Sequence, residues 1–130
     1  MTPDQEVVPS LFFAHESMRA SQQEMIADGI EALSERGSLL AAAPTGIGKT
    51  AAALASTLEF TNSVHDFLYR PKILFMTGRQ SQHKIVVETV RQINSNLPSG
   101  TPRIKLVDII GREGMCESVD KSTGKCSCEE

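Results

Sequence analysis

The sequence predicts an α/β fold in which a parallel sheet is flanked by helices. Three short apolar runs, residues 38–43, 72–77 and 104–110, alternate with stretches of helical periodicity. That order is typical of a parallel sheet with right-handed crossover connections. Each run is unbroken rather than alternating, as in a strand that is covered on both faces. A sheet of three such strands is incomplete, because its open edge leaves backbone N–H and C=O groups unpaired.

Three stretches of the chain are expected to form helices. In residues 17–36, apolar side chains recur every three or four positions, and Gly37 stands where helices commonly end. We expect the second helix to run over about 49–60 and the third over 81–94. The turn-forming residues 98–102 end the third helix.

A glycine-bearing loop connects the first apolar run to the second helical stretch. Its sequence is Ala43-Pro44-Thr45-Gly46-Ile47-Gly48-Lys49-Thr50. Gly46 and Gly48 allow several backbone N–H groups to face one concavity, as in a phosphate-binding loop (P-loop). In such a loop Lys49 reaches the β and γ phosphates of ATP, and the Thr50 hydroxyl ligates Mg²⁺. Ala43 replaces the usual first glycine. The flanking strand and helix favour a P-loop nucleoside triphosphatase over a chance strand–turn–helix junction.

Length, composition and charge narrow the class of protein. The chain has 130 residues, which suggests one domain, and its hydrophobic fraction of 40% allows a modest core. A net charge of −3 gives no global attraction to nucleic acid, so any DNA contact has to be local. No apolar run reaches the roughly 18 residues of a membrane span, and the acidic N-terminus is not a secretory signal. We therefore expect a cytoplasmic protein that does not enter a membrane.

Three cysteines lie near the C-terminus, at Cys116, Cys126 and Cys128. Because the sequence has no export signal, ligation of a metal by the cysteine thiolates is a better interpretation than a disulfide framework. An iron–sulfur cluster needs four thiolates, so one ligand is missing from this chain. A zinc site with three thiolates and one other ligand is an alternative, and so are free, solvent-exposed thiols.

The order of four short segments along the chain indicates a family. These segments are residues 19–25, 43–50, 77–82 and 111–116. Together they resemble the start of an XPD-type DNA helicase. This type belongs to the superfamily 2 iron–sulfur helicases, which include the DinG-like enzymes. The four segments are most similar to those of archaeal members. The resemblance runs from about Phe12 to the last residue. It implies the N-terminal part of a RecA-like ATP-binding domain over residues 1–111, and the beginning of an iron–sulfur domain over 112–130. It also implies an ATP-dependent 5′–3′ helicase that acts on single-stranded or forked DNA.

The resemblance also implies roles for individual residues. Gln22, with Arg19 beside it, matches the glutamine that reads the adenine edge of ATP. The segment that touches the single-stranded DNA backbone contributes Thr77, Ser81 and Gln82. Cys116 matches the first ligand of a [4Fe–4S] cluster. Each role has a structural alternative: Gln22 could be a polar residue at the core edge, and Ser81 with Gln82 could be a helix N-cap and first-turn residue.

Parts of the helicase machinery are missing from the sequence. No Asp-Glu-x-His box, which would position Mg²⁺ and activate water, occurs in the 130 residues, and neither does a second motor domain. We therefore expect the N-terminal piece of a longer helicase chain, without DNA-stimulated ATPase activity of its own. The alternatives are a P-loop ATPase of another class, such as a kinase or a partner-switching ATPase, and a short non-catalytic nucleotide- or metal-binding module.

Overall fold

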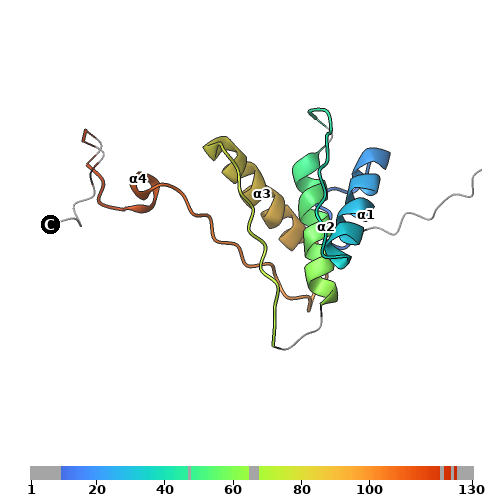
Figure 1. The fold of residues 1–130 in the computed structure, drawn as a ribbon. Coiled ribbons are helices and arrows are strands. Elements are labelled where there is room, and N and C mark those ends of the chain that lie inside the picture. Colours follow the sequence, from blue (N-terminus) through green and yellow to red (C-terminus); the bar gives the residue numbers. More distant parts are fainter. Residues whose placement is uncertain (1–9, 47, 65–67, 121, 124, 126–130) are drawn as a thin grey trace, which may run out of the picture.

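The computed structural model describes residues 10–46, 48–64, 68–120, 122–123 and 125, and its regular structure is helical. The helices are α1 (Ala20–Ser34), α2 (Lys49–Ser63), α3 (Gln80–Asn96) and the single turn α4 (Arg112–Met115). Figure 1 shows α1, α2 and α3 next to one another, with extended chain before and after α3. The three predicted helices are confirmed, and α2 and α3 each extend two or three residues beyond their predicted C-terminal ends.

The predicted parallel sheet is wrong for the part of the chain that the structure describes. Residues 38–43, 72–77 and 104–110 contain no strand, and no backbone–backbone hydrogen bond joins these runs to one another. Many of their side chains are exposed; Leu40 is 98% exposed and Met76 81% exposed. An apolar run forms a strand only where a second strand pairs with its backbone, and these runs have no such partner among the described residues.

Helices α1 and α2 approach each other closely because small residues meet where they pack. A Cβ atom added to Gly29 of α1 would lie 2.9 Å from both Cβ and Oγ of Ser56 of α2. One apolar cluster fills this interface with side chains from both helices and from the segment before α1. Its buried members are Phe13, Ile26, Ala51, Ala52 and Ala55. The absence of a side chain at Gly29 thus sets the spacing between α1 and α2.

A second apolar cluster joins α2 to α3. Its buried members are Phe12, Ala14, Leu54, Leu58, Val86, Val90 and Ile93. The segment at residues 10–14 therefore contributes side chains to both clusters. It is held at its ends by a hydrogen bond from Asn96 Nδ2 to the Ala14 carbonyl (3.2 Å) and by another from the Ser10 hydroxyl to Glu59 (2.8 Å).

A side chain of α3 holds the beginning of the third extended run. Asn94 Nδ2 donates to the Ile104 carbonyl (3.0 Å), and the Ile104 N–H donates to Asn94 Oδ1 (2.8 Å). These two bonds give Ile104 the donor and acceptor that a neighbouring strand would supply. No helix in the described part of the chain is long and apolar enough to cross a bilayer.

Candidate functional site

The loop at residues 43–48 has the backbone geometry that its two glycines predict. Gly46 has φ 87° and Gly48 has φ 77°, in the left-handed region that side chains disfavour. The space where a Cβ atom of Gly46 would lie has no atom within 4 Å, whereas at Gly48 a Cβ would collide with the Gln22 side chain. The loop is therefore open at Gly46, whereas at Gly48 the Gln22 side chain leaves no room for a Cβ atom. Ile47, between them, lies outside the described residues.

Helix α2 begins directly after the loop with an end that no side chain caps. Gly48 is the N-cap residue, so it offers no capping oxygen, and no acidic residue stands in the first turn. The first backbone N–H groups of a helix lack partners within it and carry the positive end of its dipole. An uncapped helix start that follows a glycine loop is suited to bind an anion.

The two predicted catalytic residues, Lys49 and Thr50, are the first residues of α2. The exposed Lys49 ammonium group folds back over the loop and donates to the Ala43 carbonyl, 2.8 Å away. Thr50 is half-buried, and the predicted loop residues Pro44 and Thr45 are exposed. The ammonium group is thus held over the predicted phosphate loop by the neutral Ala43 carbonyl, an acceptor that an anion could replace.

Gln22 is buried against the loop rather than placed on the outer edge of the core. It is 4% exposed. Its Oε1 accepts the Arg19 backbone N–H (3.0 Å), and its Nε2 donates to the Gly48 carbonyl (3.4 Å). Its amide therefore joins the first turn of α1 to the last residue of the loop.

Arg19 also contacts the glycine loop. The sequence resemblance placed it beside Gln22 and did not predict this contact. Its Nη1 donates to the Gly46 carbonyl over 2.6 Å. Arg19 is also the N-cap residue of α1, a position that usually holds Ser, Thr, Asp or Asn. An arginine at a helix start, near a phosphate-loop motif, was the available signal.

The predicted DNA-contacting residues lie at the start of α3. Figure 1 shows that α2 and α3 begin at the same end of the molecule. Ser81 and Gln82 are exposed in the first turn, and the half-buried Thr77 donates to the Arg79 carbonyl (3.3 Å). The N-cap of α3 is Arg79, so Ser81 is not the capping residue that the structural alternative required.

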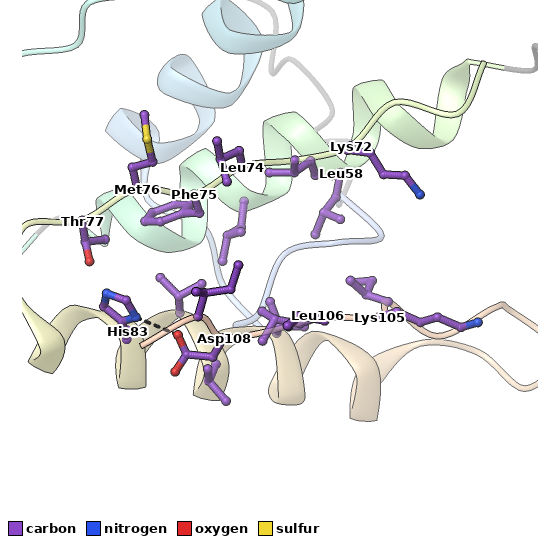
Figure 2. A pocket seen from close by; sticks show the side chains of 18 of the residues that line it. Leu58, Lys72, Leu74, Phe75, Met76, Thr77, His83, Lys105, Leu106 and Asp108 are labelled. Atoms are coloured by element: carbon purple, nitrogen blue, oxygen red, sulfur yellow. Dashed lines mark hydrogen bonds and ion pairs between the residues drawn. The ribbon is translucent and has the colours of Figure 1, made fainter. Parts of the chain in front are cut away.

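An open groove of about 710 Å³ separates the two later extended runs. Its walls are residues 71–77 and 104–109, and its floor consists of apolar side chains of α2 and α3. In Figure 2, Lys72 and Lys105 lie toward one end of the groove, and His83 and Asp108 lie at the other. There His83 Nδ1 is 2.7 Å from Asp108 Oδ1, a contact between α3 and the third run. No residue of the glycine loop lines this groove, so it is distinct from the loop.

The described residues do not assemble a metal site from the C-terminal cysteines. Cys116 is half-buried just after α4, while Cys126 and Cys128 lie outside the described part. Within that part, no group of three or more His, Cys, Asp or Glu side chains could hold a metal ion. Between Cys116 and Cys126 in the sequence, the Ser122 hydroxyl and backbone N–H both donate to the Asp120 carboxylate. These hydrogen bonds lower the pKa of the Asp120 carboxyl.

Comparison with known proteins gives one match, and it spans the loop and the three long helices. A family model described as type III restriction enzyme, res subunit, matches residues 15–111. No curated protein and no solved structure matches the chain. The matched region includes both the glycine loop and the segment at the start of α3. Because the match covers well over half of the sequence, the chain belongs to the type III restriction enzyme res subunit family, a helicase-like family of superfamily 2.

Proposed function

We propose that this chain binds ATP with Mg²⁺ through residues 43–50, as the ATP-binding part of an XPD-type DNA helicase that moves 5′ to 3′. Membership of a helicase-like family indicates an ATP-dependent enzyme that acts on nucleic acid. The XPD type and the direction of movement rest on the sequence resemblance. The observation that carries the proposal is the loop itself: two left-handed glycines followed by an uncapped helix with a lysine as its first residue.

The residues present fit a bound triphosphate. The open space at Gly46 leaves room for an anion beside the loop backbone, and the start of α2 supplies N–H donors that have no partner within the helix. Lys49 would exchange the Ala43 carbonyl for phosphate oxygens, and a charge-assisted hydrogen bond is stronger than the neutral-acceptor bond that it replaces. Thr50 would hold Mg²⁺, which neutralises phosphate charge. The contact of Gln22 with the adenine is proposed from the sequence resemblance, and its amide would have to exchange its bonds to Arg19 and Gly48 for it.

Substitution of Lys49 tests nucleotide binding. We expect Lys49→Ala to weaken binding of a fluorescent ATP analogue at least roughly tenfold, because a charge-assisted contact to phosphate is lost. Binding should also weaken when EDTA removes Mg²⁺. Lys72→Ala, which removes an exposed lysine far from the loop in sequence, is the matched control. Equal affinities for the wild type and Lys49→Ala would show that the loop does not bind phosphate.

Substitution at the start of α3 tests the assignment to a DNA helicase. We expect the double variant Ser81→Ala with Gln82→Ala to bind single-stranded DNA roughly three- to tenfold more weakly, because contacts to the DNA phosphates and sugars position the strand. Its affinity for ATP should be unchanged. The control is Gln92→Ala with Ser95→Ala, an exposed pair toward the opposite end of the same helix. If both double variants bind DNA like the wild type, a P-loop ATPase of another class becomes the better assignment.

The domain division and the cluster remain predictions. We propose that residues 1–111 belong to the ATP-binding domain and that 112–130 begin an iron–sulfur domain with Cys116, Cys126 and Cys128 as ligands. Among the described residues no group of three or more His, Cys, Asp or Glu side chains could hold a metal ion, and two of the three proposed ligands, Cys126 and Cys128, lie outside them. Iron and sulfide content of protein purified without oxygen, compared between wild type and Cys116→Ser, would test this ligand set.

A further inference from the structure

The first turn of α1 contacts the glycine loop at both of its left-handed residues. Arg19 Nη1 donates to the Gly46 carbonyl over 2.6 Å, and Gln22 Nε2 donates to the Gly48 carbonyl over 3.4 Å. The Arg19 N–H donates to Gln22 Oε1 over 3.0 Å, so the two loop contacts are linked through one short turn. Gly48 is also packed against Gln22, whereas nothing surrounds the position of a Gly46 Cβ. The Arg19 hydrogen bond is therefore a contact that restrains Gly46 from outside the loop.

The helix that bears Arg19 is itself fixed against the helix that follows the loop. Gly29 brings α1 within direct contact of Ser56 on α2, and buried side chains fill the interface. Arg19 and the loop thus have a common support, since the loop leads directly into α2. A restraint anchored on this support can hold the loop in one shape, which lowers the ordering cost of ligand binding.

We propose that Arg19 is a positioning residue that holds the Gly46 carbonyl and so keeps the loop open for a phosphate chain. This inference rests on the proposed nucleotide binding. Carbonyl oxygens are partially negative and repel phosphate oxygens, so a loop binds an anion well only when its carbonyls are turned outward and its N–H groups inward. The guanidinium is a permanent cation with several donors, which suits it to hold one carbonyl in a fixed direction.

The test distinguishes an Arg19 that acts on the glycine loop from an Arg19 that contacts the adenine base of ATP. Arg19→Ala, Arg19→Lys and the control Arg91→Ala, which removes an exposed arginine from α3, are compared with the wild-type chain. Two probes compete with a fluorescent ATP analogue: ATP, and inorganic tripolyphosphate, which has no base or ribose. We expect Arg19→Ala to weaken both probes by a similar factor, roughly three- to tenfold, because an exposed charge-assisted bond is lost. Arg19→Lys should recover part of the loss with its single ammonium donor.

Each other outcome overturns a specific part of the inference. Weaker ATP binding with unchanged tripolyphosphate binding would assign Arg19 to the base or ribose. Unchanged binding of both probes would show that the Gly46 contact has no effect on the ligand. A loss that follows a fall in helix content by circular dichroism, and that Arg19→Lys does not reduce, would show a role in folding alone. If wild-type protein binds neither probe, the proposed function itself fails, which is distinct from failure of the Arg19 variants.

Discussion

The α1–α2 pair and the two later extended runs differ in burial although both are rich in apolar residues. Ile26 of α1 and Leu54 of α2 are 7% and 4% exposed, whereas Leu74 and Val107 in the extended runs are 78% and 82% exposed. A helix satisfies its backbone hydrogen bonds within itself, so it can pack as soon as one apolar face meets another. An extended run needs a partner for its backbone before its side chains are enclosed. Apolar sequence therefore predicts burial only together with a means of pairing the backbone.

The largest expected effect contrasts a side chain packed between the helices with one from the extended runs. Ile93 of α3 is fully buried, and Met76 in the second run is 81% exposed. We expect Ile93→Ala to lower the free energy of unfolding by roughly 2–4 kcal/mol, because the deletion leaves a cavity. Met76→Ala should change it by less than about 0.5 kcal/mol. Urea denaturation of both variants measures the difference. Comparable losses would mean that the second run is enclosed in solution and that the contrast between the regions is false.

A smaller effect is expected from adding a side chain where α1 and α2 meet. Gly29→Leu places its Cβ against Ser56, so the helices must separate or the side chains must distort. We expect a destabilisation of about 2 kcal/mol in urea denaturation. Gly78→Leu adds the same side chain at an exposed glycine with nothing within 4 Å of its Cβ position. Tolerance of leucine at both glycines would show that the α1–α2 contact is loose.

The smallest effect concerns the contact between α3 and the third run. Asp108→Asn keeps the shape of the side chain that meets His83 but removes its charge. Because both side chains are about one-third exposed, we expect a loss of only about 0.5 kcal/mol. Asp28→Asn, an exposed substitution on α1, is the control. A loss as large as that of Ile93→Ala would mean that this contact holds the run in place.

The helices were predictable because their signal is local. The spacing of apolar residues identified α1 and α3, and a stretch of helix-forming residues directly after the glycine loop identified α2. The loop was also predictable, since its glycines require left-handed backbone that few other residues adopt. The sheet prediction failed because strand pairing depends on segments distant in sequence, and apolar composition alone does not specify them.

The sequence predicted which residues form the candidate site better than it predicted the contacts between them. Gln22 was selected by resemblance, but its hydrogen bond to Gly48 depends on how α1 packs against α2. The Arg19 contact spans 27 positions in sequence and uses a long, exposed side chain, which has no periodic signal. The link between His83 and Asp108 likewise joins residues 25 positions apart.

The segment at residues 10–14 shows that irregular backbone need not be accessible to a protease. Phe12, Phe13 and Ala14 are buried, and side chains of α2 and α3 bond to the ends of the segment. Lys72 and Lys105 lie in extended chain that is exposed. A protease must draw the chain into its own cleft, which exposed extended backbone allows and a buried segment resists. A protease of broad specificity would therefore be expected to cut in the exposed extended runs before it cuts in residues 10–14.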